Sequence, residues 1–130
     1  MKTSKTTNDS ILNALSNKKI FIITGNIDFR VGIDMLSANA ASINQEEFFN
    51  GALFVYCSKS RKQIRMVFWE GCGVWLLTRK LNKSKFYWPC KNSKSEEVIA
   101  CYEDLKALLK DPISWDILNS KNVAERLSKT

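Results

Sequence analysis

Two strand-like segments joined by a very short connection constrain the fold of this chain more than any other feature. Residues 63–70 and 74–81 are rich in aromatic, β-branched and other apolar residues, and Gly71-Cys72-Gly73 lies between them. If Gly71 and Cys72 form a two-residue turn, position 69 pairs with position 74 and position 67 with position 76. The sequence therefore predicts an antiparallel β-hairpin with a defined register.

This register sorts the side chains of the hairpin onto two faces, which a shift of one residue would exchange. The expected core face carries Ile64, Met66, Phe68, Trp75, Leu77 and Leu81, together with Arg79. The opposite face carries Arg65, Val67, Trp69, Val74, Leu76, Thr78 and Lys80. Core packing is the favoured interpretation for Phe68, Trp75 and Phe86, whereas for Trp69 packing and ligand contact are about equally favoured.

Apolar runs that precede the hairpin predict two strands and a helix. Residues 20–23 indicate a buried strand, and residues 51–57 are apolar on both faces, as in a central strand. Between them, apolar residues at spacings of three and four predict a helix, namely Phe29, Ile33, Leu36, Ala40 and Ile43. Asp28 is expected to cap this helix, and an i,i+4 ion pair is expected between Arg30 and Asp34.

Shorter elements are predicted after the hairpin. Residues 86–88 predict a strand that ends at Pro89, and residues 98–101 predict another. Leucines at 105, 108 and 109 predict a helix that stops before Asp111-Pro112.

Together these elements predict an α+β fold. We expect an antiparallel β-meander sheet of about four or five strands, flanked by two or three helices. Residues 18–112 are expected to form a single domain, after a polar N-terminal tail of residues 1–17. The C-terminal tail, residues 113–130, has the scattered apolar residues of a loosely docked helix.

Positive charge is concentrated in one block of the sequence. Residues 59–94 contain ten of the 20 Lys and Arg residues and one acid, Glu70, which gives this block a charge of +9. The rest of the chain has ten basic and 12 acidic residues, a charge of −2. Such a block is typical of a surface that binds phosphate backbones, although a solvated lysine-rich surface is an equally weighted interpretation of composition alone.

The residue types exclude several classes of enzyme. No histidine is present, which removes histidine bases and Ser-His or Cys-His nucleophile pairs. The four cysteines form no Cys-x-x-Cys pair and are expected to be reduced thiols. Asp28, Asp34 and Glu70 are explained as a cap, an ion-pair partner and a hairpin-tip residue, which argues against a metal-dependent nuclease. We expect no catalytic site, no metal site and no cofactor.

The sequence shows no predicted membrane segment. The first nine residues are polar, and the longest uncharged run in the middle of the chain, residues 48–58, is far shorter than the ~20 residues of a membrane helix. We expect a soluble cytoplasmic protein without a membrane partner.

Four segments resemble, in order, the motifs of one protein family. Residues 28–34 (Asp-Phe-Arg-Val-Gly-Ile-Asp) resemble its Asp-Met-Arg-x-Gly-Ile-Asp motif, and residues 51–56 resemble its Gly-x-x-Phe-Val-Phe strand. Residues 64–73 are similar to its Trp-Asp-x-x-Gly hairpin, and residues 79–89 to its Lys-Arg-Leu…Phe-x-Trp-Pro signature. The family is the TnpB accessory proteins, encoded by the second reading frame of the sixty-six family of bacterial insertion sequences.

The resemblance covers about residues 20–110, and its matched motif positions are Asp28, Arg30, Gly32, Trp69, Gly73, Leu81, Phe86 and Pro89. The chain departs from the family pattern at Glu70, where Asp is usual, at Arg79-Lys80, which inverts the usual order, and at Ser84, which replaces Gly. The tail beyond Pro112 departs further. The resemblance implies a non-catalytic accessory protein in DNA transposition, encoded beside a separate transposase.

Two hypotheses follow for how such a protein acts. In the first, the basic region 59–94 binds DNA, through contacts from Arg65, Arg79, Lys80, Lys83 and Lys85, supported by Trp69 or Trp88. In the second, the protein is an adaptor that docks on the transposase without contacting DNA, with Arg30 at the edge of the interface. The expected partners are therefore DNA, the element-encoded transposase and the other accessory protein of the element.

Overall fold

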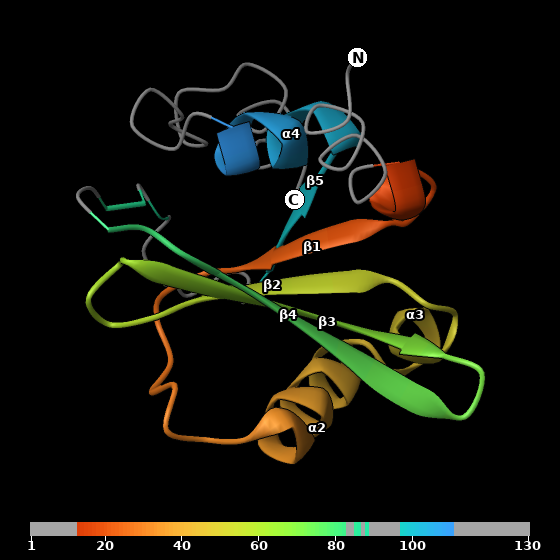
Figure 1. The fold of residues 1–130 in the computed structure, drawn as a ribbon. Helices are drawn as coiled ribbons and strands as arrows, with labels where there is room; N and C mark the ends of the chain where they lie inside the picture. Colours follow the sequence, from red (N-terminus) through yellow and green to blue (C-terminus); the bar gives the residue numbers. More distant parts are fainter. Residues whose placement is uncertain (1–12, 83–84, 87, 89–96, 111–130) are drawn as a thin grey trace, which may run out of the picture.

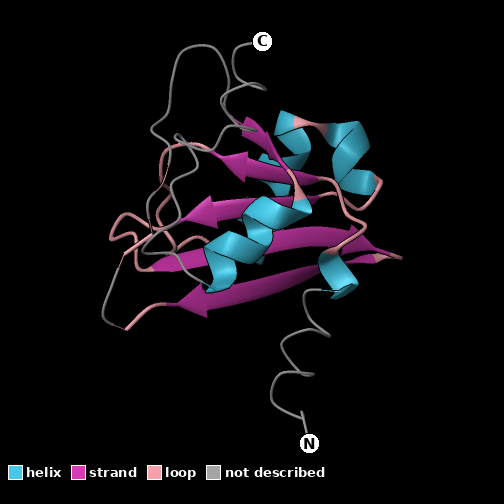
Figure 2. Cartoon of the chain, turned by 90° about the horizontal axis from the view of Figure 1, so that it is seen from above, coloured by secondary structure: helices cyan, strands magenta, loops and turns pink. Residues whose placement is uncertain are grey.

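The computed structural model describes residues 13–82, 85–86, 88 and 97–110 (Figure 1). Five strands form one sheet in the order β4-β3-β2-β1-β5, side by side in a single layer (Figure 2). The strands are β1 (Ile20–Ile23), β2 (Leu53–Cys57), β3 (Gln63–Glu70), β4 (Gly73–Lys80) and β5 (Glu97–Ala100). The helices are α2 (Ile33–Ile43), α3 (Gln45–Phe49) and α4 (Tyr102–Lys110), and residues 13–15 are also helical. The fold is α+β, as predicted.

The sheet is mostly antiparallel, but its centre is not. β2, β3 and β4 form the predicted meander, and β5 is antiparallel to β1. β1 and β2, however, are parallel, with Ile20 opposite Leu53. The prediction of an entirely antiparallel meander is therefore wrong at this pair, because α2 and α3 form a crossover that returns the chain to the end of the sheet where β1 begins.

Side chains are buried on both faces of the sheet. One hydrophobic cluster includes Ile64 and Met66 of β3 together with Leu105 and Leu108 of α4. The other includes Val67 of β3 with residues of α2 and α3, which lie on the opposite side of the sheet (Figure 1). The predicted faces of the hairpin are confirmed, but the assignment of a single core face is wrong, because helices cover both sides.

The predicted helix after β1 begins later than the apolar pattern indicates. Gly32 occupies the N-cap position of α2 and has no side-chain cap bond. Asp28 is therefore not the cap, because its carboxylate accepts instead from the backbone N–H and the guanidinium of Arg30. Arg30 lies outside the helix and pairs with Asp28 rather than with Asp34 as predicted. Residues 28–31 instead form a turn, in which the N–H of Val31 donates to the carbonyl of Asp28 at 3.2 Å, directly after Ile27 bridges to Ser58 beside β2.

The elements after the hairpin agree in part with the sequence. β5 and α4 confirm the predicted strand and helix near residues 98–110. The predicted strand at residues 86–88 is wrong, because Phe86 and Trp88 belong to no strand. Pro89 and the C-terminal tail lie outside the described residues, as does most of the N-terminal tail. No helix among the residues that the structure describes is long and apolar enough to cross a membrane.

Candidate nucleic-acid interface

The β3–β4 hairpin brings two basic segments of the chain together at one end. The predicted register is confirmed, with Trp69 opposite Val74 and Gln63 opposite Lys80. The loop before β3 therefore lies beside the end of β4, and the backbone N–H of Leu81 donates to the carbonyl of Lys62 at 2.7 Å. We call this region the basic end, which consists of Lys59, Arg61, Lys62, Arg79, Lys80 and Lys85.

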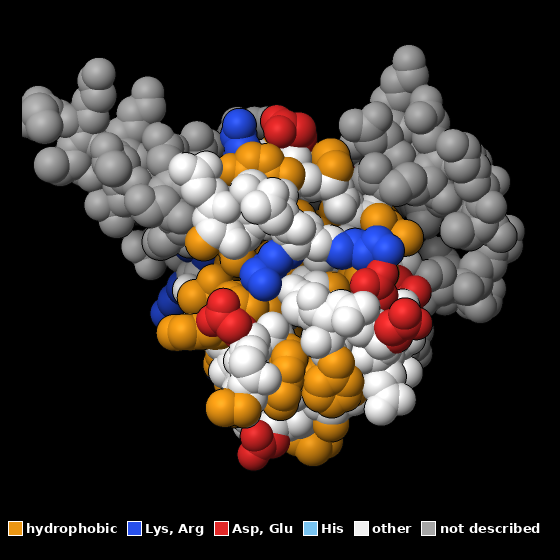
Figure 3. All heavy atoms as spheres, turned by 90° about the vertical axis from the view of Figure 1, so that its right-hand side faces the viewer, with side chains coloured by type: hydrophobic (Ala, Val, Ile, Leu, Met, Phe, Trp, Pro, Cys, Tyr) orange, Lys and Arg blue, Asp and Glu red, His pale blue; other side chains and the backbone are white. Residues whose placement is uncertain are grey.

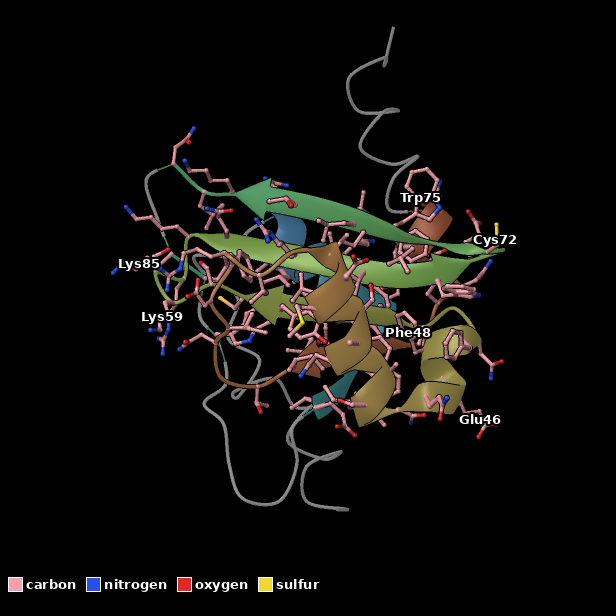
Figure 4. All side chains as sticks on the ribbon, turned by 90° about the horizontal axis from the view of Figure 1, so that it is seen from below. Glu46, Phe48, Lys59, Cys72, Trp75 and Lys85 are labelled. Carbon is pink, nitrogen blue, oxygen red and sulfur yellow. The ribbon has the colours of Figure 1, made fainter. Side chains whose placement is uncertain are left out.

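The six side chains of the basic end form no salt bridge with another described residue. All six are exposed to solvent. The salt bridges found among the described residues are Lys19–Glu47, Arg30–Asp28 and Lys106–Glu103, so none involves the basic end. Lys59 and Lys85 project at the same end of the sheet in Figure 4, opposite Cys72 and Trp75. Cations that share a surface without carboxylate partners create a positive potential that attracts polyanions.

A network of backbone and hydroxyl hydrogen bonds holds the loop that carries half of these cations. Ser58 is buried; its N–H donates to the carbonyl of Gln63, and its hydroxyl accepts from the N–H of Gln63 at 3.2 Å. The N–H of Arg61 donates to the Ser58 carbonyl at 3.0 Å, and Arg61 has a φ of 62°, in the left-handed region. Phe86 is tied to the same loop by an N–H bond to the Arg61 carbonyl at 2.7 Å. The loop is therefore fixed to the sheet rather than free.

The motif segment at Asp28 lies beside the same loop. The bridge between Ile27 and Ser58 brings it there. Hydrogen bonds from Arg30 hold the pKa of the Asp28 carboxyl at about 2, below its usual 3.8, and the charge of Lys59 contributes to this shift. The side chain of Arg30 is 91% exposed. Asp28 and Arg30 are thus an exposed pair at the margin of the basic end, whereas Gly32 caps α2.

Arg65 differs from the basic end, although it was predicted to contact DNA. Its Nη1 donates to the carbonyls of Phe29 at 2.9 Å and Val31 at 3.2 Å. Its guanidinium lies 4.5 Å from the centre of the Phe29 ring, and its Nε is buried without a partner. Arg65 therefore holds the segment before α2 to the sheet through its Nη1 and the face of its guanidinium.

Trp69 and Trp88, which were also predicted to contact DNA, instead make contacts within the protein. Trp88 is 6% exposed and donates its indole N–H to the carbonyl of Ile23 at 2.8 Å, so its ring cannot stack on a base. Trp69 is half-buried, and its ring packs against Phe48 and Phe49 at centroid distances of 6.2 and 5.1 Å. Of the three aromatics assigned to the core, Phe68 and Phe86 are buried, but Trp75 is 54% exposed.

Of the predicted cations, the structure brings Arg79, Lys80 and Lys85 together, and Lys83 lies outside the described residues. Sequence reasoning did not select Lys59, Arg61 and Lys62. The signal for them was present, because they belong to the +9 block and the predicted register already places the loop before β3 beside the end of β4. Of the remaining motif positions that the structure describes, Gly73 begins β4, Leu81 packs on the core, and Phe86 is buried.

The opposite end of the hairpin, which we call the tip, carries acidic and apolar groups. Cys72 is exposed in the turn, and Trp75 donates its indole N–H to Glu70 at 2.8 Å. Phe49 of α3 is 48% exposed. The face of the molecule at this end mixes hydrophobic and acidic side chains with a few basic ones (Figure 3).

No group of three or more Cys, Asp or Glu side chains that could hold a metal occurs in the described part of the chain. Cys57, at the end of β2, is buried, and burial raises the pKa of its thiol to about 12. A thiol held protonated in this way is neither a ready nucleophile nor a ready metal ligand.

Comparison with known proteins gives matches in sequence. The model of the family described as IS66 Orf2 like protein matches residues 18–119. Two curated proteins of Sinorhizobium fredii (strain NBRC 101917 / NGR234) are similar to the chain. The uncharacterized protein y4hO is 29% identical over 56% of this chain and 64% of its own length, and y4jC is 32% identical over 55% and 61%. The chain thus spans about three fifths of the length of these relatives. No solved structure matches.

Proposed function

The chain belongs to the IS66 Orf2-like family, whose members have an accessory role in transposition, and we propose that it fills this role by binding the phosphate backbone of DNA through its basic end. The observation that carries the proposal is the clustering of six exposed cations, unpaired among the described residues, on a loop and a strand end that hydrogen bonds hold together. No catalytic step is assigned to the chain itself.

The distribution of the cations supports phosphate binding by this surface. The cations come from two segments, 59–62 and 79–85, so the positive charge covers a surface rather than a single loop. Neutralising phosphates with Lys and Arg releases counterions, which supplies most of the affinity of sequence-independent DNA binding. The aromatic side chains near these cations are packed inside the protein, so the proposed contacts are ionic, without stacking by Trp88.

A second candidate is the adaptor that docks on the transposase. The exposed Arg30 at the margin of the basic end favours it, because Arg is enriched at protein interfaces and an acidic protein surface would meet the same cations. The two candidates share a surface but differ in the partner, and a DNA-binding measurement on the isolated full chain separates them.

The test is a salt titration of duplex binding by paired variants. Lys62→Gln/Lys80→Gln removes two neighbouring cations of the basic end, and Lys19→Gln/Lys106→Gln removes two cations that are paired elsewhere with Glu47 and Glu103. Both variants change the net charge by the same amount. We expect the slope of log binding constant against log salt concentration to fall by about 2 in the first variant and by much less in the second.

A duplex with the terminal sequences of the element and a random duplex of equal length are compared in the same titration. Equal slopes for the two double variants would place phosphate binding elsewhere on the chain. Absence of DNA binding together with co-purification of the transposase would overturn the DNA proposal in favour of the adaptor.

A further inference from the structure

β4 is an edge strand with few of the features that normally prevent an edge from pairing with another strand. It spans eight residues, pairs with β3 along its whole length without a bulge, and no strand lies beyond it in the described part of the sheet. Residues 73–78 contain no charged residue and no proline. Edge strands are normally protected from pairing by charges, prolines, bulges or a covering element, because their free N–H and C=O groups are a template for another strand.

The hairpin register determines which groups of β4 point outward. Glu70 and Gly73 close the two-residue turn, so they form a hydrogen-bonded pair, as do Phe68 with Trp75 and Met66 with Leu77. The alternate residues of β4, namely Val74, Leu76, Thr78 and Lys80, therefore direct their backbone N–H and C=O groups away from β3. This is a row of donors and acceptors at the spacing that a further antiparallel strand requires.

We propose that this edge pairs with β4 of a second copy of the chain, antiparallel and with Leu76 opposite Leu76 of the second copy, which joins two five-stranded sheets into one. Each twofold-related strand supplies the same outward groups, so such an interface is closed and self-complementary. This inference is argued from the backbone and charges of β4 and not from the proposed DNA binding, although Arg79 belongs to both surfaces.

The charges at the end of β4 favour an antiparallel arrangement of the two β4 strands over a parallel one. A parallel arrangement would place Arg79 and Lys80 beside the same residues of the second copy, and like charges on neighbouring strands repel. In the antiparallel register, Arg79 lies opposite Gly73 of the second copy. Gly73 has no side chain, and a Cβ at its position would meet no atom within 4 Å. The guanidinium can therefore extend across Gly73 toward Glu70, the residue opposite Gly73 on β3.

The same register explains the exposure of Trp75. Glu70, Trp75, Leu77 and Arg79 share one face of the hairpin, and Trp75 would lie opposite Leu77 of the second copy. Side chains directly opposite each other on neighbouring strands are in contact, so this pair would bury apolar surface of both residues. Trp75 is 54% exposed in the isolated chain despite stacking on Phe68, so it has apolar surface left to bury.

Analytical ultracentrifugation of the full chain without DNA tests the pairing. We expect a monomer–dimer equilibrium that is weakened roughly tenfold by Glu70→Arg alone or Arg79→Glu alone. The double variant Glu70→Arg/Arg79→Glu should restore the affinity of the original chain. Within one chain these two residues lie at opposite ends of the hairpin, so the rescue arises only between two copies.

A backbone variant tests the edge itself. Thr78→Pro removes an N–H that points outward, leaves the bonds to β3 in place, and should give a monomer, whereas the matched Thr78→Ala should still dimerise. Circular dichroism checks that both variants fold. A chain that remains monomeric at its highest soluble concentration overturns the proposal, as does a dimer that persists in Thr78→Pro or a double variant that is not rescued.

Discussion

At one end of the β3–β4 hairpin six exposed cations face solvent, whereas at the other end Glu70, Cys72 and Trp75 form an acidic and apolar tip. The same two strands build both ends. Because the strands are antiparallel and joined by a two-residue turn, the loop before β3 and the end of β4 must lie together, far from the turn. The hairpin therefore gathers these six cations at one end and leaves Glu70, the one acidic residue of the basic block, at the other.

Arg65 lies between these ends and belongs to neither. Its charge is used within the fold, on two carbonyls and the ring of Phe29, whereas Arg79 on the neighbouring strand is exposed. Cations from the same basic block thus have two different roles, and replacing matched residues separates them.

The largest expected effect is a difference in the free energy of unfolding between variants of a buried tryptophan, Trp88, and an exposed one, Trp75. Trp88→Ala removes a buried ring and its bond to Ile23 and should lower the free energy of unfolding by about 4 kcal/mol. Trp75→Ala at the tip should cost about 1 kcal/mol, because the ring is half exposed. Urea denaturation followed by circular dichroism measures both. Similar losses for the two variants would refute the assignment of Trp88 to the core.

The next largest effect is a difference in the free energy of unfolding between variants of Arg65, which bonds within the protein, and Arg79, which is exposed. Arg65→Ala removes two hydrogen bonds from a charged group and a cation–π contact, and we expect a loss of about 3 kcal/mol in the free energy of unfolding. Arg79→Ala should change it by less than about 0.5 kcal/mol. The same denaturation experiment checks this pair. If Arg65→Ala weakened DNA binding without a loss of stability, the assigned role would be wrong.

A smaller effect separates the cysteine at the end of β2 from the one at the tip. Burial raises the pKa of Cys57 from 9.0 to about 12, so its contribution to stability is complete below about pH 9 and is lost as the pH rises toward 12. The unfolded chain releases this proton first, which favours unfolding in that range. Cys57→Ala should flatten the fall of unfolding free energy between pH 9 and 12 relative to Cys72→Ala. Parallel curves would contradict the shift.

The sequence predicted the hairpin and its register because that information is local. Gly71 and Cys72 between alternating strands define the turn, and the turn defines every pair along β3 and β4. β2, apolar on both faces, was likewise recognisable as the central strand. The clustering of Arg79, Lys80 and Lys85 follows from the same register and the charged block.

What the sequence did not predict depends on distant partners. Arg65 bonds to carbonyls 36 and 34 residues away, and Trp88 to one 65 residues away, so no local pattern distinguished these side chains from surface ones. Asp28 has the residue type of a helix cap, but its carboxylate accepts hydrogen bonds from the guanidinium of Arg30 and not from the first turn of α2. The parallel pairing of β1 and β2 follows from the crossover through α2 and α3, which periodicity alone does not reveal.

Lysine footprinting tests the central claim, that the basic end and no other described surface meets DNA. The full chain is acetylated with and without a duplex, and the modification of each lysine is read by mass spectrometry. We predict protection of Lys59, Lys62, Lys80 and Lys85 by DNA, and unchanged reactivity at Lys19 and Lys106. Protection that is equal at all six lysines, or confined to Lys19 and Lys106, would contradict it.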